Sequence, residues 1–179
     1  YIPLQGLDTI LRAVSIIKNK IDFHLYIWGS SEQKSSPFKK MIQELSIEEF
    51  VTIHNEWENI KEWEKFIIKI CDVTLGIFGQ SSKAKTVLAN KVIDGVAFRT
   101  PVITAHSGGL YNYFTGKNDI FTTENNPTDL AHCIENIYHL QYSDIKERID
   151  NAYEVYQNYF TPEQFDKKLI FYLSEQVKN

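Results

Sequence analysis

A loop rich in glycine and serine, with two lysines, follows the apolar run Val73–Phe78 and leads into a helical pattern. We expect that helix to begin near Leu88 and to end near Phe98. The first amides of a helix have no acceptor inside it, and the helix dipole favours negative charge there, so this segment suits a diphosphate. A plain connecting loop, which many α/β domains have, is the alternative. The candidate binding residues are Gly79, Ser81, Ser82, Lys83, Thr86, Val87 and Leu88.

Three polar residues share one side of the first turns of that helix. Asp94 lies one turn beyond Asn90 and three residues beyond Lys91. A carboxylate at this place can accept both hydroxyls of a ribose, and a lysine ammonium can bind a phosphate as a point charge. The spacing also fits an ordinary surface ion pair between Lys91 and Asp94, which would contribute little. Spacing alone leaves both interpretations open.

The elements that must position these residues alternate between two periodicities. Strand-sized apolar runs occupy Phe23–Trp28, Val51–Ile53, Val73–Phe78, Pro101–Thr104 and Ile120–Thr122. Helical patterns separate them: one runs from Leu7 to Ile17, another includes Phe38, Ile42 and Leu45, and a third covers Trp57–Ile70. This order predicts a doubly wound α/β domain, with helices on both faces of a parallel sheet. Ligands of such domains bind at the carboxyl ends of the strands, which here are the loops after Trp28, Ile53, Phe78 and Thr104.

Three helices are expected after Pro127, at Asp129–Leu140, Ser143–Tyr159 and Pro162–Gln176. Thr161 and Pro162 form a start signal for the last of these helices. We expect its apolar face to pack on the sheet; docking onto a separate domain is the alternative. That face consists of Phe165, Leu169, Tyr172 and Leu173.

The composition excludes several classes of function. The formal net charge is -4 and the lysines are dispersed, so a nucleic-acid partner is not expected. Cys71 and Cys133 have no metal-ligand spacing and are expected to be reduced, buried thiols. The apolar runs are too short for a membrane span and no basic-then-apolar leader is seen, so we expect neither a signal peptide nor a membrane span within this segment. Because the chain opens at Tyr1 without an initiator methionine, we expect more of the protein to precede it.

Asp94-Gly95-Val96-Ala97-Phe98-Arg99-Thr100-Pro101-Val102-Ile103-Thr104, followed by His106-Ser107-Gly108-Gly109, resembles a known family motif. The family is the retaining family 4 glycosyltransferases of GT-B architecture, whose motif is a glutamate, seven residues, a second glutamate, and then a Gly-x-Pro strand. Gln5-Gly6-Leu7-Asp8 is similar to the segment that opens the first helix of that family's donor domain. The resemblance extends in order over nearly the whole chain. It implies that residues 1–179 form one Rossmann-like, three-layer α/β/α domain with a parallel sheet, the C-terminal half of a GT-B protein.

Three departures from the family pattern concern the donor. Thr86 stands where the family has its first glutamate, which contacts the donor sugar. Asp94 stands where a longer glutamate grips ribose, and Gln5 stands where a phosphate-binding lysine is common. The cation at the phosphates would then come from Lys83, Lys85 or Lys91.

The resemblance implies transfer of a sugar from a nucleoside diphosphate sugar to an acceptor hydroxyl with retained configuration. The nucleoside diphosphate sugar is a substrate and no cofactor is expected. The resemblance also implies that no metal is required, and the sequence agrees with this, since it has no Asp-x-Asp pair and no histidine and carboxylate cluster at a strand end. The resemblance implies electrostatic catalysis by a preorganised anion site. The spacing agrees, because no Ser/His/Asp or Cys/His nucleophile can be assembled from it.

The resemblance also implies where the protein acts and with what. An N-terminal acceptor-binding domain would be the partner, and any membrane contact would be made through that missing part. We expect a cytoplasmic location, or a peripheral one at the inner face of the membrane, in the synthesis of a surface polysaccharide or glycolipid. His54, after an expected strand, would lie near the nucleobase or be a plain turn residue, and Ser107-Gly108-Gly109, beside His106, would face the sugar.

Two other functions stay open. The substitution of Thr86 and Gln5 for family residues fits a non-catalytic module of the same fold, kept as a scaffold or binding partner. A sugar-nucleotide epimerase of similar architecture is the other alternative.

Overall fold

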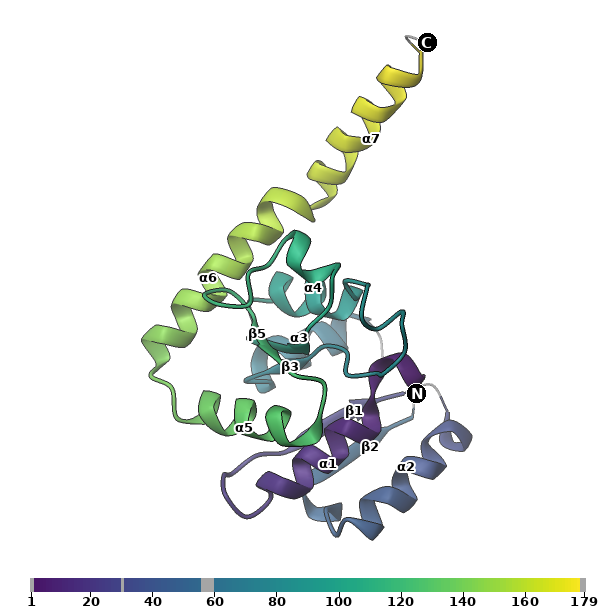
Figure 1. Ribbon diagram of the computed structural model, residues 1–179, viewed down its shortest axis with the longest axis vertical. Coiled ribbons are helices and arrows are strands. Elements are labelled where there is room, and N and C mark those ends of the chain that lie inside the picture. Colours follow the sequence, from purple (N-terminus) through teal and green to yellow (C-terminus); the bar gives the residue numbers. More distant parts are fainter. Residues whose placement is uncertain (1, 30, 56–59, 178–179) are drawn as a thin grey trace.

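The computed structural model describes residues 2–29, 31–55 and 60–177 (Figure 1). In the N-terminal half the elements are η1 (Pro3–Gln5), α1 (Leu7–Ile17), β1 (Leu25–Trp28), α2 (Glu32–Glu44), η2 (Glu48–Phe50), β2 (Val51–His54), α3 (Ile60–Ile70) and β3 (Thr74–Leu75). They are followed by α4 (Asn90–Ala97), β4 (Val102–Ala105), η3 (Leu110–Asn112), β5 (Phe121–Thr123), α5 (Pro127–Tyr138), α6 (Tyr142–Tyr159) and α7 (Pro162–Val177). Each expected element is present, although residues 57–59 of the third expected helix lie outside the described residues.

Every paired strand runs parallel to its neighbour, which confirms the predicted α/β class. The strands form two hydrogen-bonded groups, β1–β2 and β3–β4–β5, and not the single sheet that we expected. The difference arises at β3, because the residues that follow it pair on one side with β4 and on the other with the N-terminal turn. Gly76 donates to the Ile103 carbonyl at 2.7 Å, whereas Phe78 donates to the Gln5 carbonyl at 3.0 Å.

Helices cover the strands on two sides and create two apolar clusters. On one side α1 packs on α2 and α5, and its buried face includes Leu11 and Ile17. On the other side α4 packs on β3, β4 and α6, and its core residues are Val92 and Val96. The four residues of β4 are buried, as expected of a strand covered on both faces. The strands therefore hold their carboxyl ends at one edge, where the loops meet.

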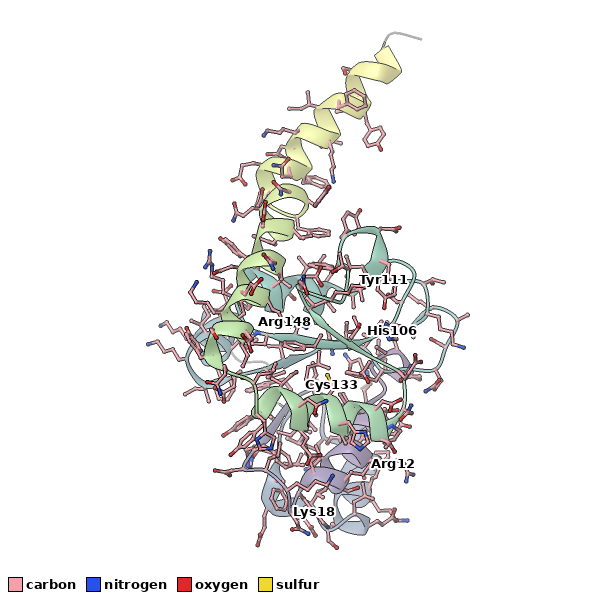
Figure 2. All side chains as sticks on the ribbon, turned by 60° about the vertical axis from the view of Figure 1, so that its left-hand side comes forward. Arg12, Lys18, His106, Tyr111, Cys133 and Arg148 are labelled. Carbon is pink, nitrogen blue, oxygen red and sulfur yellow. The ribbon has the colours of Figure 1, made fainter. Side chains whose placement is uncertain are left out.

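The two cysteines are free thiols, as the sequence predicted, and both are partly buried. Cys133 is labelled in Figure 2. Burial raises the pKa of Cys133 to about 11, although the nearby positive charge of Arg148 opposes the shift. Burial and the negative charge of Asp72 also raise the pKa of Cys71. Both side chains are therefore neutral at physiological pH and act as small apolar residues.

The expectation that the last helix packs on the sheet is wrong. Figure 1 shows α7 continuing beyond α6 and away from the body of the domain. Its apolar side chains are exposed: Phe165 is 65% exposed and Tyr172 is 66% exposed. The spacing had shown only which residues share a face, because periodicity carries no information about what covers that face.

Candidate functional site

The loop after β3 begins at a tight contact with the N-terminal turn. The Gly79 amide donates to the Leu4 carbonyl at 3.1 Å, and a Cβ on Gly79 would lie 2.2 Å from the Pro3 oxygen. Gly6, in the N-terminal turn, lies against the backbone of Phe78 and Gly79 and has a left-handed φ of 63°. Glycine is needed here so that two stretches of backbone can touch. The amide of Gly79 is thus engaged within the protein and is not free to bind an anion.

Residues 81–87 form a turn stabilised by its own hydrogen bonds. The Ser81 hydroxyl accepts from the Ala84 amide at 3.2 Å, and the Lys83 carbonyl accepts from the amides of Thr86 and Val87. The Thr86 hydroxyl donates back to the Lys83 carbonyl at 3.1 Å. Ser81, Ser82, Lys83 and Thr86 are exposed, whereas Val87 and Leu88 are partly buried. The turn presents its polar side chains to solvent on a rigid backbone.

The loop after β4 supports this turn from behind. The buried Ser107 hydroxyl donates to the Val87 carbonyl at 2.7 Å and accepts from the Leu110 amide at 3.2 Å. The Gly108 amide donates to the Lys85 carbonyl at 2.8 Å. A Cβ on Gly109 would lie 2.6 Å from the Thr86 oxygen. Ser107, Gly108 and Gly109, which we expected to face a sugar, therefore position the β3–α4 loop.

The first turn of α4 has unsatisfied amides. Ala89 precedes the helix in an extended conformation and makes no side-chain cap. By contrast, Ser31 caps α2 and Asn126 caps α5, the helices that follow β1 and β5. The amides of Asn90 and Lys91 have no acceptor among the residues that the structure describes. Two donors and the positive end of the helix dipole therefore face the carboxyl edge of the strands.

Lys91 and Asp94 are partly buried on this helix, and neither is paired. Burial lowers the pKa of the Lys91 ammonium and raises the pKa of the Asp94 carboxyl. Neither side chain has an ion pair or hydrogen bond among the described residues. The surface Lys91–Asp94 ion pair, which the spacing also allowed, does not form. Two desolvated charges without partners are costly, and a ligand with phosphates and hydroxyls would compensate both.

His54 lies at the end of β2 within an aromatic group that the sequence did not predict. Its ring stacks on Trp28 with centroids 4.9 Å apart, and Phe66 packs edge-on against Trp28 at 4.7 Å. The indole nitrogen of Trp28 is buried without a hydrogen-bond partner among the described residues. His54 is thus held as part of a flat aromatic surface at the end of β1 and β2. His54 therefore lies at a different strand end from the loop that leads from β3 into α4.

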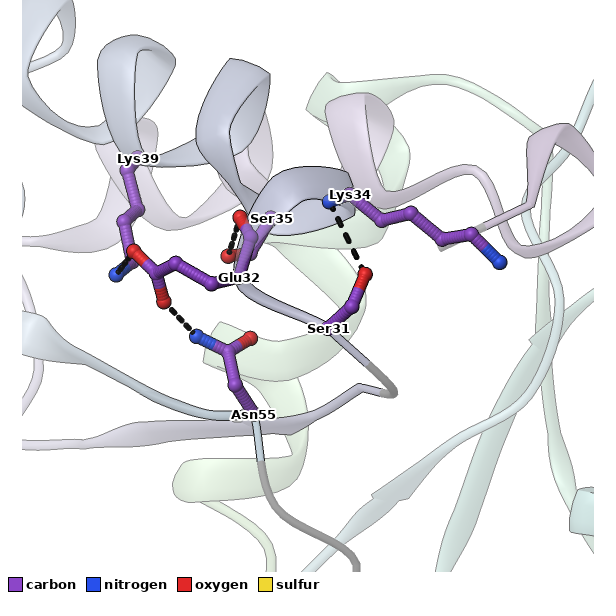
Figure 3. A network of polar contacts seen from close by, with 6 residues as sticks. All are labelled: Ser31, Glu32, Lys34, Ser35, Lys39 and Asn55. Carbon is purple, nitrogen blue, oxygen red and sulfur yellow. Dashed lines mark hydrogen bonds and ion pairs between the residues drawn. The ribbon is translucent and has the colours of Figure 1, made fainter.

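A polar network fixes the loops beside this aromatic group (Figure 3). Glu32, at the start of α2, binds both Lys39 and Asn55, the residue after His54. The Ser31 hydroxyl accepts from the Lys34 amide at 3.3 Å. The network joins the start of α2 to the residue that follows β2, beside the aromatic group.

A cleft of about 360 Å³ opens between the loops that follow β3, β4 and β5. Of the residues that the sequence singled out, Gly79, Lys85, His106, Ser107 and Gly108 line it. The sequence analysis did not predict Glu124 and Asn125, the polar residues after β5. Their position directly after an expected strand could have indicated them, because ligands of this fold bind at the carboxyl ends of strands. The polar lining consists of Lys85, His106, Ser107, Tyr111, Glu124 and Asn125. In the described ranges, no group of three or more histidine, cysteine, aspartate or glutamate side chains could hold a metal ion.

The sequence profile of the family described as glycosyl transferases group 1 matches residues 1–139. The chain belongs to this family. No curated protein sequence matches the glycosyltransferase chain significantly. Outside the masked residues, none of its helices combines the length and apolar character needed to cross a membrane.

Solved structures show that the glycosyltransferase chain has the fold of their Rossmann-like GT-B domains. A glycosyltransferase from Rickettsia africae aligns with a TM-score of 0.82 and 20% identity, over 98% of this chain and 45% of that one. Sucrose-phosphate synthase from Thermosynechococcus elongatus gives 0.79 and 19%, over 97% and 42%. Anabaena HepE, solved in complex with UDP-glucose, gives 0.79 and 15%, over 98% and 46%. The chain thus spans less than half the length of these proteins.

Proposed function

We propose that this domain binds a nucleoside diphosphate sugar at the start of α4, as the donor-binding half of a glycosyltransferase. The observation that carries the proposal is the pair Lys91 and Asp94, which are partly buried and oppositely charged. Neither has a partner among the described residues, and the two amides beside them at the start of α4 have no acceptor there either. A nucleoside diphosphate offers phosphate oxygens to the amides and the ammonium, and ribose hydroxyls to the carboxylate. One ligand thus satisfies all of these groups.

The same groups would act on the reaction by stabilising the departing diphosphate. Cleavage of the bond between sugar and phosphate places negative charge on the phosphate oxygens. The Asn90 and Lys91 amides and the Lys91 ammonium are held in place before that charge develops, so little reorganisation is needed. In the family that the sequence resembles, the leaving phosphate helps to deprotonate the acceptor hydroxyl and the configuration is retained. We extend both features to this protein. The reaction would then depend on the positioning of donor and acceptor and would use no protein nucleophile.

The remainder of the proposal concerns the whole protein. The chain covers less than half of the sucrose-phosphate synthase and of the Rickettsia africae glycosyltransferase, so the acceptor would bind to a separate N-terminal domain and this domain alone would not catalyse transfer. HepE, which shares the fold, was solved with UDP-glucose, which makes UDP-sugars the first donors to test. We place the full protein in cytoplasmic synthesis of a surface polysaccharide or glycolipid, with neither metal nor other cofactor.

Calorimetry and ¹⁵N NMR titrations with UDP, GDP and ADP test the proposal directly. We expect one of the three to bind with a micromolar to millimolar Kd and to shift the amide resonances of Asn90 and Lys91. Uridine and inorganic pyrophosphate are the controls, because each carries only half of the recognised groups. Absence of binding by all three nucleotides at millimolar concentration would overturn the proposal.

One observation favours a non-catalytic module as the second candidate. Thr86 occupies the place of the family's sugar-binding glutamate, and its hydroxyl is satisfied by the carbonyls of Ser82 and Lys83. Such a module would bind UDP and UDP-sugars with equal affinity, and the full-length protein would show no donor turnover. A donor that binds more tightly than its nucleotide, together with turnover, would exclude this candidate.

A further inference from the structure

The Ser107 hydroxyl joins backbone groups that belong to two different loops. It accepts from the Leu110 amide at 3.2 Å and donates to the Val87 carbonyl at 2.7 Å. Leu110 is 1% exposed and belongs to the apolar cluster that includes Val92, so one end of this bridge is anchored in the core. The other end holds the last part of the β3–α4 loop. Ser107 therefore connects the backbone that leads into α4 to the interior of the domain.

Ser107 has no hydrogen left with which to donate to a ligand. A serine hydroxyl carries a single hydrogen, and here the Val87 carbonyl accepts it. The residue is also buried, with only 6% of its surface exposed. Any effect of Ser107 on a ligand at α4 must therefore pass through the backbone that its hydroxyl binds.

The Val87 carbonyl and the Leu88 amide belong to one planar peptide group. In a trans peptide the C=O and N–H bonds point in opposite directions, so a fixed carbonyl also fixes the direction of the next N–H. Gly109 packs against the same group, because a Cβ on Gly109 would lie 2.9 Å from the Val87 carbonyl carbon and 2.7 Å from the Leu88 nitrogen. The direction of the Leu88 amide is thus set by residues of the loop after β4.

Leu88 is the first of four consecutive residues whose amides have no acceptor in the part of the chain that the structure describes. The other three are Ala89, which precedes α4, and Asn90 and Lys91, with which the helix begins. Donors that are oriented in advance bind an anion with little reorganisation, whereas donors that can rotate lose part of the binding free energy. Rotation of the peptide between Val87 and Leu88 would disturb this row of amides at its first member.

We propose that Ser107 is a positioning residue of the diphosphate site, because its bond to the Val87 carbonyl holds the Leu88 amide ready to donate to a phosphate. The inference rests on the proposed function, since it concerns the same ligand. It adds a residue from the loop after β4 that governs the affinity for the diphosphate without contacting it. This role differs from the sugar contact that the sequence led us to expect of Ser107, and the two roles predict different dependences on the ligand.

Ser107→Ala and Ser107→Thr test this role, because the alanine removes the hydroxyl and the threonine keeps it. Ser35→Ala is the matched control (Figure 3). Ser35 is also buried, and its hydroxyl donates to a backbone carbonyl, that of Glu32 in α2, at 2.8 Å. The probes are whichever of UDP, GDP and ADP binds the wild type most tightly, its nucleoside, its glucose conjugate and inorganic pyrophosphate. Calorimetry gives the affinities, ¹⁵N NMR follows the Leu88 amide, and thermal denaturation gives the stability.

We expect Ser107→Ala to weaken the nucleotide and pyrophosphate by the same factor, about tenfold, and to leave the nucleoside unchanged. The Leu88 amide resonance should move in the free Ser107→Ala domain, and pyrophosphate should shift it less than in the wild type. Ser107→Thr should bind the nucleotide within about threefold of the wild type. Ser35→Ala should lower the melting temperature as Ser107→Ala does and should change no affinity, which separates positioning from a loss of stability.

An unchanged nucleotide affinity in a folded Ser107→Ala domain overturns the inference, and so does a loss of affinity that Ser35→Ala shares. A loss confined to the glucose conjugate also overturns it, because that result indicates direct contact with the sugar. If Ser107→Ala does not fold, titration of the wild type with pyrophosphate decides. A shift of the Leu88 resonance supports the inference, and a Leu88 resonance that stays in place while those of Asn90 and Lys91 shift contradicts it.

Failure of this inference can be distinguished from failure of the proposed function. If the wild type binds none of the three nucleotides, the proposed function fails and the inference fails with it. If the wild type binds a nucleotide and Ser107→Ala binds it equally tightly, only the role of Ser107 is overturned.

Discussion

Lys91 and Asp94 lie on the same side of α4, partly buried, and neither pairs with the other or with any other described residue. Burial disfavours the charged form of both groups, as the opposite directions of their pKa shifts indicate. The unliganded domain therefore carries two destabilising charges at the place where we put the diphosphate and the ribose. Such a conflict between stability and binding is common at functional sites.

Lys91→Met is expected to weaken nucleoside diphosphate binding at least tenfold, because it removes the cation from the phosphates. The same change is expected to raise the free energy of unfolding of the unliganded domain by about 0.5–2 kcal/mol, since a desolvated charge is lost. Calorimetry and urea denaturation measure the two effects. Lys69→Met, in the last turn of α3, is the control and should change neither. A Lys91→Met domain with unchanged affinity would remove this lysine from the site.

Asp94→Asn is expected to weaken UDP binding and to leave inorganic pyrophosphate binding nearly unchanged, because the carboxylate is assigned to the ribose. In the wild type, UDP affinity should fall as the pH drops through the Asp94 pKa, which burial raises above its ordinary value of 3.8. The asparagine variant should lack this fall.

The pH dependence of the domain's stability has the opposite sign to that of UDP binding. A carboxyl whose folded-state pKa is raised adds stability at low pH, and that contribution is lost as the pH rises through the folded pKa. Urea denaturation of the unliganded domain between pH 3.5 and pH 7, wild type against Asp94→Asn, measures it. A wild-type curve parallel to that of the variant would contradict the assigned burial.

Gly79→Ala is expected to destabilise the domain by about 2–4 kcal/mol, because the new methyl group would lie 2.2 Å from the Pro3 oxygen. Gly108→Ala is the matched control. A Cβ on Gly108 would have the Lys85 oxygen as its nearest neighbour at 3.8 Å, which is ordinary contact. Thermal denaturation of both variants compares them, and equal losses would show that the contact with the N-terminal turn is dispensable.

Removal of residues 165–179 is expected to change the free energy of unfolding by less than about 0.5 kcal/mol, since the apolar side chains of α7 are exposed. The shortened chain should also self-associate less, because a large exposed apolar surface is lost. Analytical ultracentrifugation and thermal denaturation provide the two measurements. A large drop in stability would indicate that α7 packs on the domain in solution.

The sequence by itself determined the α/β class, the order of the elements and the position of the loop that leads into α4. Those features depend on local periodicity and on turn residues such as Gly79 and Thr161, which act over short distances along the chain. Asn90, Lys91 and Asp94 could be grouped for the same reason, since helical spacing alone puts them on one side.

Only the tertiary structure decided which groups are already satisfied. It showed that the Gly79 amide binds Leu4 and that Ser107 supports Val87, contacts between segments far apart in sequence. It also left Lys91 and Asp94 without a partner in the described part of the chain, and it brought Glu124 and Asn125 to the same cleft as Lys85. Pairing, burial and the cover of an apolar face such as that of α7 depend on which distant segments meet, and no single stretch of sequence contains that information.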